Sequence, residues 1–392
     1  MSRRELLASA GLAATGWMML NAAAGADSPG GNVEDRGSSI RITGLKTYPI
    51  GGTRVLIKIE TNREVFGWGE ISQLVPKAAV ALVESMFSLL DGENPTRVEY
   101  LWQKLYRAHR DFRGGAFMVH TISAIDMALW DIAGKLYGVP VYRLLGGPCL
   151  DKIRVYPSPK ATKTGTGKPY PYSGDAKDIQ VLVNNVKVAR KQVGPEGTVM
   201  FDAHGSIPPA TLIQFANAIE PYNVLWIEEP AVPGNIEVFK RLKQQIKVPI
   251  ATGERDRTIW EVIPYLQNNA IDILQPDCAH GGGISQIKKI ATLAEAYNTS
   301  IAPHSIASFL GVTASFHAAA AVPNFLIHEY YPQGFDGILR KNWEVDKDGY
   351  ASLPQGPGLG VEVDEVALGK VDANKTFKWP GAKYPDGSIA DY

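Results

Sequence analysis

Cysteine is scarce in this chain of 392 residues, which contains only Cys149 and Cys278. The two lie far apart and lack metal-ligand spacing, so the sequence suggests neither a disulfide framework nor a zinc site. An excess of charge is also absent, because 40 Lys and Arg residues balance 40 Asp and Glu residues. A chain with balanced charge has no overall positive electrostatic potential to attract nucleic acid or anionic lipid. We therefore expect a small-molecule partner and no nucleic acid.

The N-terminus differs from everything after it. Residues 1–26 begin with the pair Arg3-Arg4, continue as an apolar stretch and end in small residues. This pattern resembles a bacterial twin-arginine signal peptide, which exports folded proteins. We therefore expect a periplasmic or otherwise exported bacterial protein, a linker over 27–39, and no membrane segment in the mature form. An uncleaved membrane anchor is the alternative, because the run is nearly long enough to span a bilayer.

Two periodicities divide the rest of the chain. Residues 40–72 alternate apolar and polar side chains, as antiparallel strands do, and a helical pattern follows from Lys77 to about Leu145. These patterns predict an α+β domain over 40–148. Residues 343–392 return to turns and short strands, and we expect this segment to pack back on the α+β domain.

After residue 195, short apolar runs end on polar residues, and a helical segment follows each run. The terminal residues recur at intervals of 26, 26, 23, 27 and 25 positions: Asp202, Glu228, Glu254, Asp277, His304 and Glu329. Units of near-constant length with right-handed crossovers close naturally into a parallel barrel. We predict an α/β barrel over 149–342, with these side chains gathered on the rim where such barrels carry their chemistry.

Three acids, Asp202, Glu228 and Glu254, end neighbouring strands and would face one another across the barrel mouth. Their mutual repulsion requires a compensating charge. Ligation by oxygen alone, with positions left for water or substrate, favours Mg²⁺ over zinc. Helix capping or surface ion pairing is the alternative, and it explains one such acid better than three at equal spacing.

Histidines on the same rim are candidate acids and bases. Asp277 beside His304 would fix its tautomer and raise its basicity, which suits a general base. His204 lies two residues after Asp202, and residues i and i+2 of a strand share a face, so it would point into the same pocket. Glu329, if protonated, could donate a hydrogen bond to a carboxylate oxygen opposite the metal, with a surface salt bridge as the alternative.

The segments around these residues resemble a known family. They are Asp202-Ala203-His204 and residues 226–230, 251–255, 274–277 and 302–304, together with 124–135 and 357–360 in the flanking parts. The chain resembles the enolase superfamily, in its mandelate racemase and muconate lactonizing enzyme branch, and within it the acid-sugar (galactonate-type) dehydratases. The resemblance implies a capping domain over a modified TIM barrel, (β/α)₇β, with Mg²⁺ on Asp202, Glu228 and Glu254.

The resemblance also implies a reaction. In this family the metal binds the substrate carboxylate and stabilises the enediolate that forms when the α-proton leaves. His304, paired with Asp277, would be the base, Glu329 would hydrogen-bond the enediolate, and His204 would help to expel the β-hydroxyl as water. A hydro-lyase that converts an acid sugar to a 2-keto-3-deoxy acid is therefore expected.

Two further functions stay open, as does the substrate itself. One is a racemase, epimerase or cycloisomerase that uses the same metal, and the other is an exported, non-catalytic sugar-acid binding protein. We expect substrate specificity to come from residues 51–53, 73–77 and 157–176. A homo-oligomer is expected, because closed symmetric assemblies are common among soluble enzymes.

One region departs from the family pattern, which has two complete strand-helix units before the aspartate strand. Residues 153–156 look like the first strand and 178–192 like the helix that precedes Val199, which leaves little between them. Parallel neighbours need a crossover of about a dozen residues, so a normal first helix and second strand hardly fit. The stretch from Lys160 to Lys163 is not the Lys-x-Lys pair common there, which puts a base from this unit in doubt. Tyr170 and Tyr172 could enter the pocket, although a polar loop is the alternative.

Overall fold

The computed structural model describes residues 37–166, 176–331, 335, 337–372, 381, 383–384 and 386–389. The expected signal peptide, most of the linker, and both Tyr170 and Tyr172 lie outside these residues. The chain divides into a unit of residues 1–38 and a unit of residues 39–392, and the architecture below belongs to the second.

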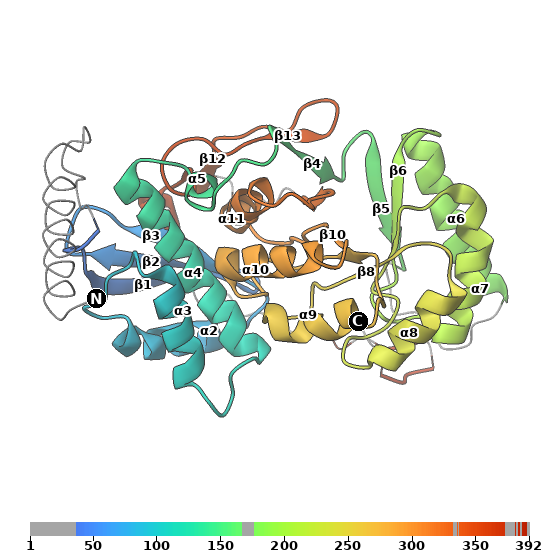
Figure 1. Cartoon of the computed structure of the whole chain (residues 1–392), viewed down its shortest axis with the longest axis horizontal. Helices are drawn as coiled ribbons and strands as arrows, with labels where there is room; N and C mark the ends of the chain where they lie inside the picture. The colour runs from blue at the N-terminus through green and yellow to red at the C-terminus, as the bar shows by residue number, and fades with distance from the viewer. Residues whose placement is uncertain are drawn as a thin grey trace, which may run out of the picture. The chain divides into compact units, whose positions relative to one another are not determined.

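The first part of this unit is an antiparallel sheet of order β1-β2-β3, followed by helices. Its elements are β1 (Ile42–Gly51), β2 (Arg54–Thr61), β3 (Gly67–Ile71), α2 (Pro76–Met86), η1 (Phe87–Leu89), α3 (Val98–Ala108), α4 (Ala116–Tyr137) and α5 (Val141–Leu144). The predicted α+β order of sheet then helices is confirmed (Figure 1). Among the described helices, α4 alone is long and apolar enough to cross a membrane, but 83% of its apolar window is buried inside the protein, as in a core helix.

Strand β3 lies directly on α4 because two of its residues have no side chain. A Cβ atom on Gly67 would stand 2.0 Å from the carbonyl oxygen of Ala128, and one on Gly69 would stand 1.9 Å from that of Ala124. These distances are below any normal contact, so only glycine permits the approach. The sheet and the long helix therefore form one tightly packed pair of layers.

The second part is a parallel barrel. Its elements are β4 (Lys152–Tyr156), β5 (Ala161–Gly165), α6 (Ala176–Val193), β6 (Thr198–Asp202), α7 (Pro209–Ile219), η2 (Glu220–Tyr222), β7 (Ile227–Glu228), α8 (Ile236–Gln245), β8 (Ile250–Thr252), α9 (Thr258–Gln267), β9 (Ile273–Leu274), α10 (Gly283–Glu295), β10 (Ser300–Ile301), α11 (Phe309–Ala320) and β11 (His328–Glu329). Six strands pair in the order β10-β9-β8-β7-β6-β5. Backbone bonds from Leu326 to Ile301 and from Glu329 to Pro303 join the last strand to β10, and β11 pairs in parallel with β4. The predicted barrel is confirmed.

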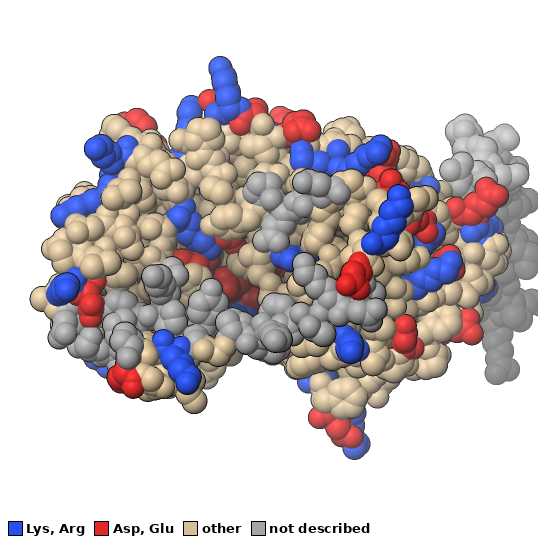
Figure 2. All heavy atoms as spheres, turned by 180° about the vertical axis from the view of Figure 1, so that it is seen from behind, with Lys and Arg blue, Asp and Glu red and all other residues tan. Residues whose placement is uncertain are grey.

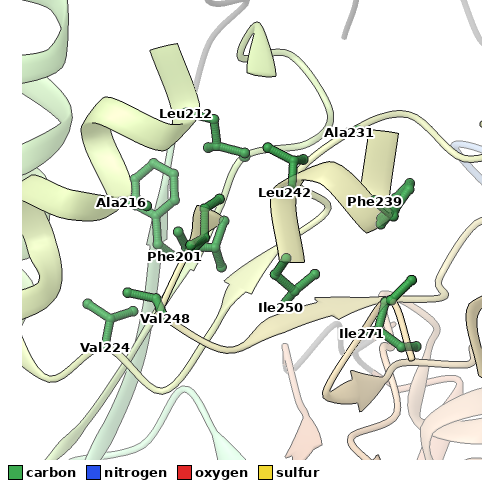
Figure 3. Packing of buried hydrophobic residues seen from close by; sticks show 14 of the residues in the cluster. Phe201, Leu212, Ala216, Val224, Ala231, Phe239, Leu242, Val248, Ile250 and Ile271 are labelled. Atoms are coloured by element: carbon green, nitrogen blue, oxygen red, sulfur yellow. The ribbon is translucent and has the colours of Figure 1, made fainter. Parts of the chain in front are cut away.

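An apolar layer fills the space between the barrel strands and the outer helices (Figure 3). Phe201 of β6 and Ile250 of β8 pack with Leu212 of α7 and with Phe239 and Leu242 of α8, and all five are fully buried. Each such side chain contributes roughly 1.5–3 kcal/mol to stability. This packing holds the strand ends, and the polar residues on them, in fixed positions.

The step between β4 and β5 differs from every later step. Only residues 157–160 join the two strands, so the helix that would normally separate them is missing, as predicted. Strand β5 nevertheless forms, pairing with β6 from Ala161 opposite Thr198 to Gly165 opposite Asp202. The prediction that a second strand hardly fits was wrong, because backbone pairing with β6 holds a short polar strand in place. Among the described residues, β4 and β5 share no ladder.

The C-terminal segment contacts both parts. It contains β12 (Leu339–Lys341), β13 (Tyr350–Ser352), β14 (Val361–Val363) and α12 (Glu365–Leu368). The backbone N–H of Leu359 donates to Asp131 of α4, and Glu365 pairs with Lys58 of β2 at 2.6 Å, so the segment contacts the first domain. It also extends the barrel sheet, because β13 pairs antiparallel with β4.

Candidate active site

Three predicted acids converge at the carboxyl ends of the barrel strands. Asp202 ends β6, Glu228 ends β7 and Glu254 lies two residues beyond β8. One carboxylate oxygen from each lies within 4.8 Å of the others. Asp202 and Glu254 line a cavity of about 460 Å³ with His204, His304 and Glu329, and acidic side chains are visible at the bottom of a hollow in Figure 2.

Lys163 of β5 reaches the same acids, although sequence reasoning placed no functional residue there. Its Nζ donates a hydrogen bond to Glu228 Oε1 at 2.7 Å, and it lies 3.0 Å from Asp202 Oδ2 and 2.7 Å from Glu329 Oε1. Lys163 faces the cavity because Ala161, Lys163 and Gly165 share one face of β5. A cationic residue from this altered unit therefore enters the site.

The charges perturb one another strongly. Burial and the neighbouring Glu228 raise the pKa of Asp202 to about 7. Burial would also raise the pKa of Glu228, but the ammonium of Lys163 outweighs it and lowers that pKa to about 2. At neutral pH Glu228 is thus ionised, whereas Asp202 is close to its pKa, as expected for carboxylates crowded into one pocket.

The donor set fits a hard divalent cation. Asp202 Oδ2 is buried and lacks a hydrogen bond with correct geometry among the described residues, although Lys163 and His204 Nε2 lie 3.0 and 3.1 Å away. All three acids offer oxygen, which Mg²⁺ prefers, and none of the three predicted ligands is a thiolate or imidazole. Asp202, Glu228 and Glu254 are therefore the residues that would hold such an ion.

His304 and Asp277 form a hydrogen-bonded pair on the same rim. His304 Nδ1 lies 2.7 Å from Asp277 Oδ2, and because a carboxylate only accepts, Nδ1 carries the hydrogen. His304 Nε2 therefore faces the acids, 3.5 Å from Glu254 Oε2 and from Glu329 Oε2. Burial would lower the pKa of His304, but the carboxylates of Glu254, Glu329 and Asp277 outweigh it and raise that pKa well above its usual value.

Glu329 is buried between the cation and the histidine. Its Oε1 contacts Lys163, and its Oε2 accepts a hydrogen bond from the backbone N–H of Ser305 at 3.3 Å. Its pairing with Lys163 is therefore not a surface salt bridge. The adjacent His328 is fully buried, and its Nε2 lies 2.7 Å from the hydroxyl of Ser315 on α11.

His204 borders the cavity, but not for the reason that the strand pattern gave. Strand β6 ends at Asp202, and His204 has a left-handed backbone with φ of 48°. The turn, not the strand alternation, brings His204 Nε2 to 3.1 Å from Asp202 Oδ2 and leaves half of its side chain exposed. Burial of the remainder lowers the pKa of His204, so the imidazole is a weak base there.

Capping-domain and loop residues complete the cavity. Gln73, which follows β3 and lies in a segment predicted to set specificity, lines it together with Ile306 and Tyr331. Neither Ile306 nor Tyr331 carried a signal in the sequence, because each follows a strand end in a loop whose direction only the fold fixes.

Comparison with known proteins agrees with this arrangement. Residues 50–146 match the family model for the mandelate racemase / muconate lactonizing enzyme N-terminal domain, and residues 156–367 match the model described as enolase C-terminal domain-like. The chain belongs to the enolase superfamily. The predicted resemblance and the predicted enzyme class are both confirmed, and the dehydratase relatives below indicate a hydro-lyase.

Curated relatives of this enolase-superfamily chain carry the name D-galactonate dehydratase. The protein of Ralstonia nicotianae is 33% identical over 383 residues, covering 90% of this chain and 100% of that protein. That of Cronobacter sakazakii is 32% identical with the same coverage.

Solved structures agree on the fold. An enolase structure from Agrobacterium radiobacter, with bound Na and L-malate, is 31% identical with a TM-score of 0.81, covering 89% of this chain and 99% of that one. A mandelate racemase/muconate lactonizing enzyme-like protein from Rubrobacter xylanophilus is 29% identical with a TM-score of 0.80, covering 86% and 99%.

Proposed function

We propose that this enolase-superfamily protein is a Mg²⁺-dependent dehydratase that converts an acid sugar to a 2-keto-3-deoxy acid. One observation carries the proposal: the Nε2 atom of the His304–Asp277 pair lies 3.5 Å from Glu254, one of three acids whose carboxylate oxygens cluster within 4.8 Å of one another. The galactonate dehydratase relatives support an acid sugar as the substrate class.

The proton chemistry belongs to the side chains. His304 Nε2 removes the α-proton, which converts the substrate carboxylate to an enediolate, while Asp277 holds the imidazole and stabilises its charge. Bound Mg²⁺ would supply positive charge where negative charge develops on the substrate carboxylate. Glu329 lies 3.5 Å from the base and is placed to contact the enediolate.

Loss of water needs an acid as well as a base. His204 lies beside Asp202 in the acid cluster, half of its side chain is exposed, and it lines the cavity. Its Nε2 would deliver a proton to the β-hydroxyl as that group leaves. Lys163 offsets the charge of the acids and keeps Glu228 ionised.

The test follows exchange and product together. The protein without residues 1–26 is incubated with Mg²⁺ and a set of aldonates and other α-hydroxy acids in D₂O, with deuterium incorporation and keto-acid formation recorded. We expect keto acid from one or a few acid sugars, a loss of at least about 100-fold in the His304→Asn and His204→Asn variants, and an unchanged rate in the control His109→Asn, which lies at the end of α3 outside the cavity.

The other outcomes have distinct meanings. Exchange without keto acid, and a product of unchanged mass, would replace the dehydratase with an epimerase or cycloisomerase. Tight Mg²⁺ binding without exchange on any acid would overturn the enzymatic proposal in favour of a sugar-acid binding protein.

We also propose that residues 1–26 direct export through the twin-arginine route. The support is the Arg3-Arg4 pair before an uncharged apolar run. Residues 1–39 fused to a reporter that is active only after export as a folded protein would give periplasmic signal, and Arg3→Lys with Arg4→Lys would abolish it. Export of the double variant at the normal rate would contradict the proposal.

A further inference from the structure

The imidazole of His280 also contacts Asp277, the aspartate of the proposed base pair. Nδ1 of His280 lies 3.5 Å from Asp277 Oδ2, the oxygen that accepts the hydrogen bond of His304. The backbone N–H of His280 donates to Asp277 Oδ1 at 3.1 Å, and its ring also interacts with the backbone of Glu254. One carboxylate is therefore held between two histidines, and the second of them touches the strand end that carries a proposed metal ligand.

The contact continues into the capping domain. The ring of His280 stacks on the ring of His120 from α4, with centroids 4.3 Å apart and planes inclined by 14°. His120 Nδ1 lies 3.0 Å from the backbone oxygen of Ser72, and since a carbonyl only accepts, this nitrogen carries the hydrogen. Ser72 precedes Gln73, which lines the cavity. A continuous chain of contacts thus runs from the pocket wall of one domain to the base of the other.

Packing alone is a poor explanation for the two histidines. Both are more than nine-tenths buried, and the Nε2 atom of each lacks a hydrogen-bond partner among the residues that the structure describes. An unpaired buried polar atom costs about 1–3 kcal/mol, which an apolar side chain of similar size would avoid. Apart from the interaction of the His280 ring with the Glu254 backbone, the polar contacts of these rings in the described part of the chain are made through Nδ1.

We propose that His280 is a positioning residue for His304. It contacts the same Asp277 oxygen as the base, and through its stack on His120 it connects the base pair to the capping-domain segment that lines the cavity. The role of His304 itself rests on the proposed function, whereas the positioning of the pair does not depend on which acid is the substrate.

Two substitutions at one position separate positioning from packing. His280→Leu keeps volume and removes the Nδ1 donor, while His280→Asn places an amide nitrogen near the position of Nδ1. With an acid that the enzyme converts, we expect kcat to fall about 10- to 100-fold in His280→Leu with little change in KM. In His280→Asn, kcat should recover most of that loss. His120→Phe, which keeps a stacked ring, should lower kcat less, and its effect should vanish in the His280→Leu background.

A second readout works without turnover. The Nδ1–H proton of His304 is followed as a downfield proton resonance in the complete folded chain, assigned by its absence from His304→Asn. We expect this resonance to shift or broaden in His280→Leu and to return in His280→Asn. If the wild type converts no acid, the proposed function fails while this measurement still decides the positioning.

The inference is overturned by either of two results. One is a resonance that is identical in all three proteins. The other is a kcat that is unchanged in His280→Leu, or lowered equally by the leucine and asparagine substitutions in parallel with the melting temperature, which would mark His280 as a packing residue.

Discussion

Lys163 puts one positive charge among three buried carboxylates, and this contact governs how the metal-free site is held together. Its side chain is 9% exposed, and the acids that it contacts are 2% exposed or less. Buried acids left without a partner are strongly destabilising, whereas a paired cation offsets much of their cost. Lys163 is thus a structural counter-charge as well as a part of the candidate active site.

We predict that Lys163→Met lowers the free energy of unfolding of the metal-free protein by about 3–5 kcal/mol, because it removes the partner of buried charges. Mg²⁺ should then stabilise the variant more than the wild type, since the ion replaces the lost charge. Urea unfolding in EDTA and in excess Mg²⁺ measures both. An equal effect of Mg²⁺ on the two proteins would contradict this reading of Lys163.

The sequence predicted the residues that end apolar strands and missed the one that does not. Asp202 and Glu228 follow buried runs, so their rim position could be predicted, whereas Lys163 lies in the polar strand Ala-Thr-Lys-Thr-Gly without an apolar signal. Its place depends on pairing with β6, a non-local contact that periodicity does not encode. His204 was placed by strand alternation, but a left-handed turn takes it out of the strand.

At the scale of elements, glycine residues allow β3 to pack closely on α4 within the capping domain. We predict that Gly69→Ala destabilises the protein by about 1–3 kcal/mol, because its Cβ would meet the Ala124 carbonyl at 1.9 Å and backbone would have to move. Thermal unfolding measures the loss.

A matched glycine provides the control. Gly369 follows α12 with an ordinary backbone conformation, and an added Cβ there would meet nothing closer than 3.5 Å. Gly369→Ala should leave the melting temperature nearly unchanged. Equal losses of stability for both substitutions would mean that the close approach of β3 to α4 does not cause the loss in Gly69→Ala.

The barrel units after residue 195 were predictable because each carries its own apolar run, polar terminal residue and helix. The first step was not, since residues 157–160 replace a helix and leave no periodic signal. The short chain between Tyr156 and α6 indicated that a helix is missing, but it could not show that β5 still forms. Such an element depends on its neighbour, so the sequence of the element alone does not specify it.

For the whole molecule, buried histidines join distant segments and make stability depend on pH. His317 of α11 accepts a hydrogen bond from the backbone N–H of Tyr142 and donates one to the carbonyl of Leu359. Burial lowers the pKa of His317, and that of His328, to about 4. In the unfolded chain the histidine pKa is about 6.5, so between these values the unfolded state binds more protons. The stability from these neutral rings is complete above about pH 6.5 and is lost as the pH falls toward 4.

We predict that each of these histidines lowers the free energy of unfolding of the wild type by about 2 kcal/mol when the pH falls from 7 to 5. His317→Asn, whose amide oxygen can still accept from Tyr142, should be less stable at pH 7 but lose correspondingly less on acidification. Chemical unfolding at both pH values tests this. Parallel losses in variant and wild type would assign the acid sensitivity to other groups.

The ammonium group of Lys163 in the acid cluster also bears on the order of folding and metal binding. Because Lys163 offsets part of the charge of the carboxylates, we expect the chain to fold without Mg²⁺, so that the proposed ion would bind to a pocket that has already formed. Under the proposed Mg²⁺ dependence, folding and activation would be separate steps, and the supply of the ion would limit only activation.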